Sequence, residues 1–118
     1  MISKKDILEE LNRYKNKYII VEGKKDKFAL EKLNFTKIYK LEKPLFEEVE
    51  LISAETKEVV ILTDLDTEGK KIYSYLKKHL QEHGVKINDN LRKFLSKTEI
   101  KQIEGLAHYL KDESMPNM

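Results

Sequence analysis

The chain has 118 residues, enough to bury about two-thirds of its unfolded surface in one ordinary core, and we expect a single domain over residues 1–118. It contains no cysteine, which excludes disulfides, thiolate zinc sites, iron–sulfur clusters and a cysteine nucleophile. No apolar run reaches the ~18 residues of a membrane span, and Lys4, Lys5 and Asp6 interrupt any signal-peptide core. We therefore expect a cytoplasmic protein that does not contact membranes.

A net charge of +2 hides an uneven distribution of charged side chains. Residues 1–40 carry a net charge of +5, residues 41–69 carry −7 and residues 70–118 carry +4. This layout suits a carboxylate cluster inside a positive rim, as in a metal site that acts on a polyanion. Solvated lysine-rich helices would give the same distribution, so charge alone does not decide between the two interpretations.

Predicted helices and strands alternate through the first half of the chain. Ser3 and Asp6 form a capping-box pattern, and Pro44 suits the first turn of a helix. The apolar residues that follow the capping box recur at helical spacing and define one face: Ile7, Leu8, Leu11 and Tyr14. The predicted elements are a helix over 3–16, a strand over 18–21, a helix from 24 to about 33, a strand over 36–41 and a helix over 44–55.

The second half continues the alternation and ends in helices. Residues 59–63 form the strongest predicted strand, because they are apolar or β-branched and uncharged. A long helix follows from 68 to 82 or 83, with Gly84 as its C-terminal cap, and 85–87 is a short fourth strand. Two further helices are predicted over 91–95 and 99–110, the second opened by Ser96 with Glu99. The expected core is 17–85, with a C-terminal helical extension over 89–112.

This alternation predicts an α/β fold with three layers, α/β/α, around a central, mostly parallel four-stranded sheet. Such sheets bind ligands at the carboxyl ends of their strands. Two strands end in acidic residues: Glu22 follows the first, and Asp64 and Asp66 follow the third. For these side chains to meet, the first and third strands must be neighbours, which predicts the strand order 2-1-3-4.

The acidic strand ends have the chemistry of a magnesium site. Carboxylates that gather after buried strands repel one another unless a cation compensates them, and Mg²⁺ takes one or two carboxylates and keeps several waters for phosphate substrates. Gly23 and Gly69 allow close backbone approach at the two turns. The alternative is that Asp64 and Asp66 are only turn and helix N-cap residues, but this does not explain Glu22.

The segments Ile19-Ile20-Val21-Glu22-Gly23-Lys24-Lys25-Asp26 and Val59-Val60-Ile61-Leu62-Thr63-Asp64-Leu65-Asp66-Thr67-Glu68-Gly69 resemble the two motifs of the Toprim domain. That domain occurs in topoisomerases, primases and several nucleases. The resemblance covers about residues 17–85. Within the family, the chain is similar to the small stand-alone proteins and, more distantly, to the nuclease that matures 5S ribosomal RNA.

The resemblance implies roles for individual residues. Glu22 matches the glutamate that acts as general acid or base or as a metal ligand, and Asp64 and Asp66 match the aspartate pair that holds Mg²⁺, or Mn²⁺. Asp26 and Glu68 match acidic positions in a supporting role around that site. Gly23 and Gly69 match the turn glycines. Lysines that flank the two turns are candidates for contacts with nucleic-acid phosphates: Lys24, Lys25, Lys70 and Lys71.

The function that these patterns favour is Mg²⁺-dependent phosphodiester cleavage of RNA or DNA. One alternative is a non-catalytic module that binds metal and nucleic acid, or a subunit that needs a partner. Residues 86–112 would then form the docking surface for that partner, or they would only complete the core. The basic residues of this segment are Arg92, Lys93, Lys97 and Lys101. The small size is compatible with a homodimer or with membership of a larger nucleic-acid-processing complex.

Two other motifs in the sequence resemble those of enzymes. Asp64-Leu65-Asp66 is similar to the start of the haloacid-dehalogenase phosphatase motif, which leaves a phosphatase as a third interpretation, but Glu68 stands where that motif has Thr or Val. His79 and His83 with Glu82 match an inverted zinc-peptidase pattern, but that pattern needs a longer chain. No Gly-rich nucleotide loop is present.

Overall fold

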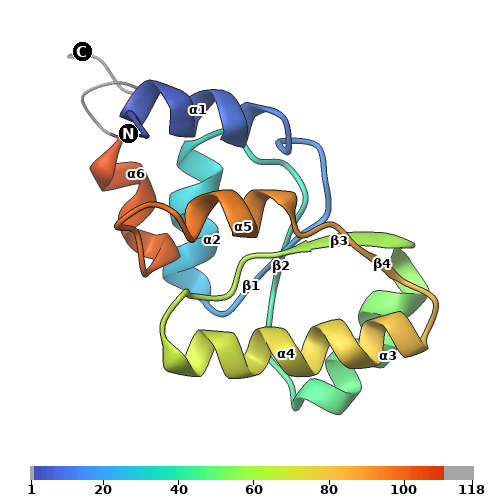
Figure 1. Cartoon of the computed structure of the whole chain (residues 1–118). Helices are drawn as coiled ribbons and strands as arrows, with labels where there is room; N and C mark the ends of the chain where they lie inside the picture. The colour runs from blue at the N-terminus through green and yellow to red at the C-terminus, as the bar shows by residue number, and fades with distance from the viewer. Residues whose placement is uncertain (1, 111–118) are drawn as a thin grey trace.

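The computed structural model describes residues 2–110, in which helices and strands alternate as expected (Figure 1). Residues 111 and 112 of the predicted C-terminal extension lie outside the described residues. The elements are α1 (Lys4–Asn12), β1 (Ile19–Val21), α2 (Lys24–Lys32), β2 (Ile38–Lys40), α3 (Leu45–Glu55), β3 (Glu58–Ile61), α4 (Thr67–Glu82), β4 (Lys86–Ile87), α5 (Asn90–Leu95), η1 (Ile103–Gly105) and α6 (Leu106–Tyr109).

The four strands form one parallel sheet in the order β2-β1-β3-β4, which confirms the predicted order. Ile20 of β1 lies opposite Ile61 of β3. Two residues further along each strand, the chain reaches Glu22 on one side and Thr63 on the other. The register therefore carries the acidic ends of β1 and β3 to the same edge of the sheet.

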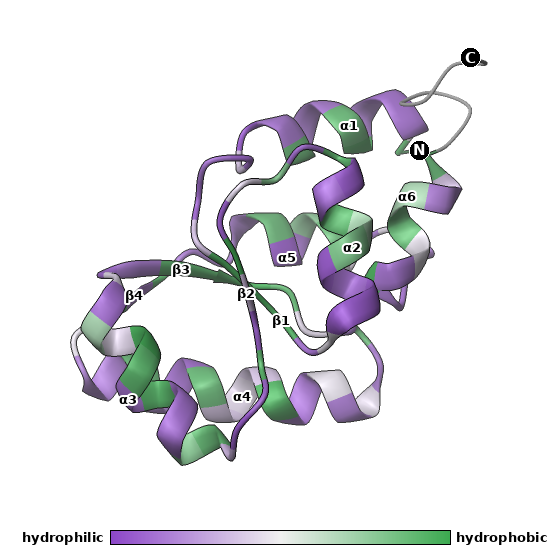
Figure 2. Ribbon diagram, turned by 180° about the vertical axis from the view of Figure 1, so that it is seen from behind, coloured by the Kyte–Doolittle hydropathy of each residue, from purple (hydrophilic) through white to green (hydrophobic). Residues whose placement is uncertain are grey.

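Helices cover both faces of the sheet, which confirms the three-layer architecture. Alternate residues of the central strands point to opposite faces, as the pleat requires. Ile19 and Val60 pack on one face against α1, α2, α5 and α6, whereas Ile20 and Ile61 pack on the other face against α3 and α4. Figure 2 shows the apolar stripes of the helices turned toward the sheet. Within the described residues, no helix is long and apolar enough to cross a membrane.

Local signals place most helix ends correctly. Ser3 and Asp6 form the predicted capping box of α1, with hydrogen bonds of 3.1 and 2.9 Å. Gly84 follows α4 with a positive φ of 80°, a conformation that favours glycine. Pro44 lies one position earlier than expected, at the N-cap of α3.

The predicted helix over 99–110 is wrong in its first half. Residues 99–102 are not helical, and only the short η1 and α6 follow them. The backbone groups of this segment bond to the end of β3 instead: Lys101 O accepts from Leu65 N at 2.7 Å, and Ile103 N donates to Asp64 Oδ1 at 2.9 Å. Ser96, expected to open this helix, ends α5, where its hydroxyl donates to Lys93 O.

The start of α4 packs directly on the loop after β3. The Thr63 hydroxyl donates to Gly69 O at 2.7 Å, and a Cβ at Gly69 would overlap the backbone carbonyl of Asp64. Only glycine fits this contact. Because Gly69 has no side chain, the start of α4 can pack directly against the loop that carries Asp64.

We predict that Gly69→Ala destabilises the fold by about 1–3 kcal/mol, because the overlap with the Asp64 backbone forces the loop apart. The gain in helix propensity, up to about 1 kcal/mol, acts in the opposite direction and is smaller. Gly105→Ala is the matched control, since nothing lies within 4 Å of a Cβ there. Urea unfolding of both variants measures the difference. Equal stability of the two variants would show that the loop yields without cost.

Candidate functional site

Three acidic side chains come from neighbouring strand ends at one edge of the sheet, where α2 and α4 begin (Figure 1). Glu22 directly follows β1, Asp64 lies three residues after β3, and Asp66 is the N-cap of α4. Glu22 Oε2 accepts a hydrogen bond of 2.7 Å from the backbone N–H of Asp64. The two motifs, 42 residues apart in sequence, are thus in direct contact.

Each of the three carboxylates accepts a hydrogen bond from a backbone N–H with one of its two oxygens. Asp64 Oδ1 accepts from Ile103 N at 2.9 Å, and Asp66 Oδ1 accepts from Gly69 N at 2.8 Å as a helix cap. The cap interpretation is therefore correct for Asp66, but it accounts for only one of its oxygens. Within residues 2–110, the second oxygen of Glu22, Asp64 and Asp66 has no hydrogen bond or ion pair.

Burial and neighbouring carboxylates raise the pKa values of Glu22 and Asp64. Burial raises the pKa of Glu22 above its ordinary value, and the nearby carboxylates of Asp64 and Asp66 raise it further. Burial likewise raises the pKa of Asp64, with Asp66 adding to the effect. A set of carboxylates that resists ionisation in this way favours a compensating cation.

The donor set fits a hard divalent cation that keeps part of its water shell. All three side chains supply oxygen, the ligand that Mg²⁺ prefers. Among residues 2–110, no three His, Asp or Glu side chains are already arranged to surround an ion by themselves. Mg²⁺ commonly binds through one or two carboxylates and several waters, so an open set with unpaired oxygens on Glu22, Asp64 and Asp66 suits it.

Asp26 and Glu68, both expected in a supporting role, lie in different surroundings. Asp26 is only 6% exposed, and its Oδ2 accepts from Gly23 N at 3.0 Å. Burial and the Asp64 carboxylate raise the pKa of Asp26 to about 6. Glu68 instead has a side chain that is 78% exposed and pairs with Lys71 at 3.8 Å. The structure therefore brings Asp26 to the acidic cluster and leaves Glu68 on the surface.

Arg92 supports the site from the core. For residues 86–112 the sequence left a docking surface and completion of the core as alternatives; Arg92 is buried, 7% exposed, whereas Lys93, Lys97 and Lys101 are exposed. Its guanidinium donates to the carbonyls of Ile61, Thr63 and Asp64 at 3.3, 2.7 and 3.1 Å. It therefore fixes the backbone that carries Asp64.

Of the two contributions that hold Asp64, only that of Arg92 has a signal in the sequence. Arg92 lies between Leu91 and Leu95, both buried in α5, so its position beside them indicated an inward side chain. Ile103, whose N–H holds Asp64, left no signal in the sequence, because a backbone donor is independent of residue type.

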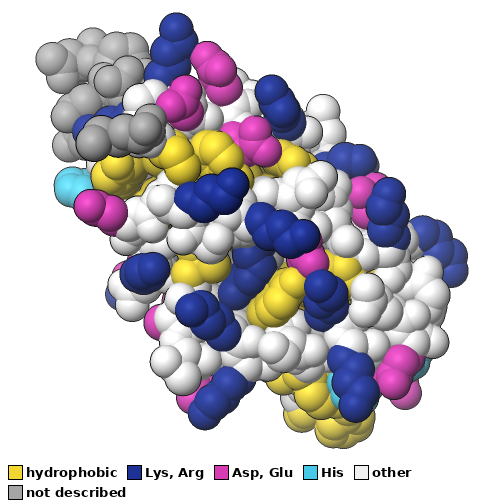
Figure 3. Space-filling model, viewed as in Figure 1, with side chains coloured by type: hydrophobic (Ala, Val, Ile, Leu, Met, Phe, Trp, Pro, Cys, Tyr) yellow, Lys and Arg dark blue, Asp and Glu magenta, His cyan; other side chains and the backbone are white. Residues whose placement is uncertain are grey.

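The lysines expected to contact phosphates all lie on the surface around the acidic cluster. Lys24 and Lys25 begin α2, and Lys70 and Lys71 lie in the first turns of α4. Figure 3 shows further Lys and Arg side chains gathered over α4 and α5, where the exposed lysines include Lys78, Lys93 and Lys97. Exposed lysines at these positions are compatible with both interpretations of the charge distribution, a positive rim and solvated helices.

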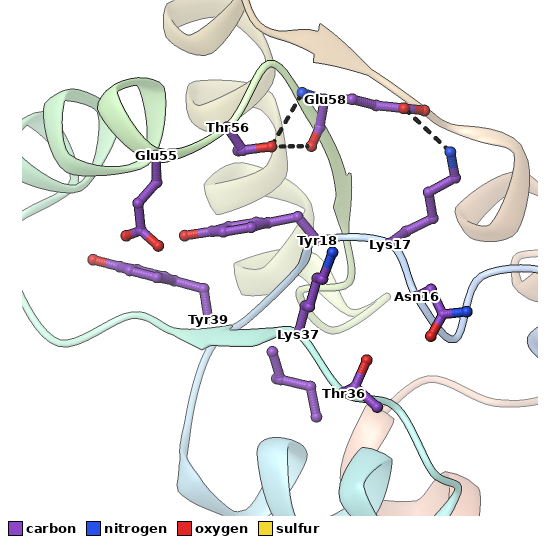
Figure 4. Close-up of a pocket in the computed structure, with 10 residues that line it drawn as sticks. Asn16, Lys17, Tyr18, Thr36, Lys37, Tyr39, Glu55, Thr56 and Glu58 are labelled. Atoms are coloured by element: carbon purple, nitrogen blue, oxygen red, sulfur yellow. Dashed lines mark hydrogen bonds and ion pairs between the residues drawn. The ribbon is translucent and has the colours of Figure 1, made fainter.

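A separate cavity of about 630 Å³ lies at the opposite edge of the sheet (Figure 4). Tyr18 and Tyr39 stack there with ring centroids 6.0 Å apart, and the Glu55 carboxylate points toward their hydroxyls. Burial and Glu55 raise the pKa of Tyr18. This cavity lies at the amino ends of the strands, whereas the acidic cluster lies at their carboxyl ends.

The histidine pattern of α4 does not form a metal site. His79 Nδ1 lies 2.8 Å from Glu82 Oε1, and His83 Nδ1 lies 2.9 Å from the backbone oxygen of His79. Both rings therefore interact within the last turns of the helix.

Comparisons with known proteins agree with the geometry of this edge. A match to the Toprim domain spans residues 17–103, and so includes the Ile103 that contacts Asp64. A UPF0292 protein of Pyrococcus abyssi is 41% identical over 92 residues, which cover 75% of this chain and 70% of the relative. One from Methanocaldococcus jannaschii is 33% identical over 112 residues, 89% of this chain and 88% of the relative.

A solved structure of a protein from Aquifex aeolicus superposes with a TM-score of 0.75 and 33% sequence identity, covering 85% of this chain and 94% of that one. The fold, the two motifs and the relatives lead to one assignment. The chain belongs to the Toprim domain family, whose members generally bind Mg²⁺ through such acidic residues in functions related to nucleic acids.

Proposed function

We propose that this protein is a Mg²⁺-dependent nuclease that hydrolyses phosphodiester bonds of RNA or DNA. The observation that carries the proposal is the hydrogen bond from Asp64 N to Glu22 Oε2, which unites the two acidic motifs at one edge of the sheet. The unpaired oxygens beside this bond and the lysines around it supply the two requirements of phosphate chemistry, a cation site and a positive surface.

Asp64 and Asp66 are the residues that would hold the cation, through the oxygens that do not bond to the backbone. Bound there, Mg²⁺ would neutralise the negative charge that develops on a phosphate during hydrolysis. Arg92 and the N–H of Ile103 keep Asp64 in place, since both contact the residue directly. A fixed position matters because electrostatic stabilisation depends on charges that do not need to reorganise.

Glu22 is the residue that we assign to proton transfer. Hydrolysis joins water to phosphorus, breaks the bond to the leaving oxygen and moves one proton from the water to that oxygen. Burial and acidic neighbours raise the pKa of Glu22, and a positioned carboxyl group can accept and donate the proton of this step. Surface lysines at 24, 25 and 70 would hold the backbone of the substrate without reading its sequence.

We predict that Glu22→Gln lowers Mg²⁺-dependent cleavage by about 10²–10⁴-fold, the range that general acid–base catalysis contributes. The amide oxygen can still accept the hydrogen bond from Asp64 N, so the fold is retained. Glu50→Gln, an exposed position of α3, is the control and keeps full activity. Cleavage of labelled RNA and DNA oligonucleotides with and without Mg²⁺ provides the measurement, and circular dichroism checks the fold.

Full activity of Glu22→Gln would remove Glu22 from the mechanism. Salt-sensitive binding by the wild-type protein, with no cleavage of any oligonucleotide, would establish the non-catalytic module instead.

We further predict that Asp26→Asn stabilises the metal-free protein at pH 7.5. The folded-state pKa of about 6 lies above the ordinary 3.8, so this carboxyl favours folding when protonated, and that contribution disappears as the pH rises through 6. A neutral amide avoids the loss, which amounts to about 3 kcal/mol at most. Thermal unfolding in EDTA at pH 7.5 and at pH 4.0 measures the effect, which shrinks at the lower pH.

Asp6 is a matched control for this experiment, because it occupies the same third position of its helix and also accepts from a backbone N–H. Hydrogen bonds from Ser3 lower the pKa of Asp6, so its ionised form favours folding. Asp6→Asn therefore lowers the melting temperature at pH 7.5. If both variants change stability in the same direction, acidic repulsion at Asp26 is not the cause.

A further inference from the structure

A groove of about 670 Å³ lies between α2 and the η1–α6 segment, on the face that Figure 2 turns toward the viewer. Its walls combine charged and aromatic side chains, among them Lys24, Lys25, Phe28, Lys32 and Glu104. None of them belongs to the acidic cluster itself.

Phe28 is an aromatic side chain left on the surface. Its neighbours Ala29 and Leu30 are buried against the sheet, but Phe28 is 58% exposed and packs in neither hydrophobic core. The ammonium of Lys32 lies 4.5 Å from the centre of its ring. An exposed ring beside a groove presents a flat apolar surface to a ligand.

The charges around this ring favour an anionic ligand. Lys24, Lys25 and Lys32 supply three positive charges, against one negative charge from Glu104. A polyanion with flat apolar groups satisfies both features at once, and nucleic acid has this composition. Proteins that bind single strands combine a positive groove for the backbone with aromatic side chains on which bases stack.

The groove lies beside the candidate catalytic edge, because residues on both of its walls are close in sequence to residues of the site. Lys24 begins α2 two residues after Glu22, and Phe28 follows four residues later, about 6 Å along the helix axis. Glu104, on the opposite wall, is next to Ile103, which contacts Asp64. A strand bound in the groove therefore leads toward the acidic cluster.

We propose that this groove binds an unpaired nucleic-acid strand, with one base stacked on Phe28 and the adjacent phosphates on Lys24, Lys25 and Lys32. The proposal rests on the nucleic-acid part of the proposed function, to which it adds a preference for single strands. In a duplex both faces of each base are already stacked, so Phe28 has no free face to contact. Stacking uses the face of the base and not the sugar, so unpaired RNA and DNA both bind.

The sequence provides a direct test, because the protein contains no tryptophan. Phe28→Trp introduces a single fluorescent reporter at the proposed stacking position. Titration with oligouridylate or oligothymidylate in EDTA, which prevents cleavage, quenches its emission as bases stack. A matched duplex at the same concentration leaves the emission unchanged.

Phe46 is the matched control. It is 60% exposed, close to the exposure of Phe28, but it lies on α3 across the sheet, beside Glu47 and Glu50. Phe46→Trp is not quenched by either oligonucleotide. In fluorescence anisotropy, Phe28→Ala weakens single-strand binding by about 5- to 150-fold, the equivalent of the 1–3 kcal/mol that one stacked base contributes, whereas Phe46→Ala binds as the wild type does.

The outcomes separate this inference from the proposed nuclease activity. Unchanged binding by Phe28→Ala, together with Glu22-dependent cleavage, overturns the inference and leaves the nuclease. Phe28-dependent binding of single strands by a wild-type protein that cleaves nothing supports the inference and overturns the nuclease. A wild-type protein that neither binds nor cleaves oligonucleotides overturns both.

Discussion

The hydrogen bond between the Asp64 backbone and the Glu22 side chain joins the two halves of the site. It exists because β1 and β3 are adjacent and parallel, so that their carboxyl ends reach the same edge of the sheet. Without that pairing, Glu22 would lie on a different loop from Asp64 and Asp66, and the carboxylates would not influence one another. Burial, together with their acidic neighbours, raises the pKa values of Glu22 and Asp64, and such a set of carboxylates favours a compensating cation.

A second set of contacts prevents the loop after β3 from relaxing away from this arrangement. Arg92 donates to three backbone carbonyls of that region, the N–H of Ile103 donates to the Asp64 side chain, and Gly69 lets α4 pack against the Asp64 backbone. A buried guanidinium is stable only when its donors are bonded, and here the bonds are to the strand end itself. The C-terminal segment is therefore structurally part of the site.

Acidic and basic side chains occupy different parts of this region of the molecule. Acidic groups lie at the strand ends, where burial limits their hydration, and lysines lie around them in full contact with water. In the proposed function, this arrangement would let a polyanion approach along the rim while a cation compensates the carboxylates. In the further proposal, the exposed ring of Phe28 in the neighbouring groove would add a stacking contact with an unpaired base.

The sequence by itself determined the alternation of helices and strands and the acidic residues at the strand ends, because these depend on periodicity, caps and short motifs within single segments. The strand order followed from the requirement that Glu22 meet Asp64 and Asp66, and the sheet confirms it. Tertiary structure alone decided that residues 99–102 are not helical, that Arg92 is buried and that Glu68 remains on the surface. The physical reason is that these outcomes depend on hydrogen bonds between segments far apart in the chain. Local propensity does not reveal partners that are distant in the sequence. The hydrogen bond from Ile103 N to Asp64 Oδ1, between residues 39 positions apart, is an example.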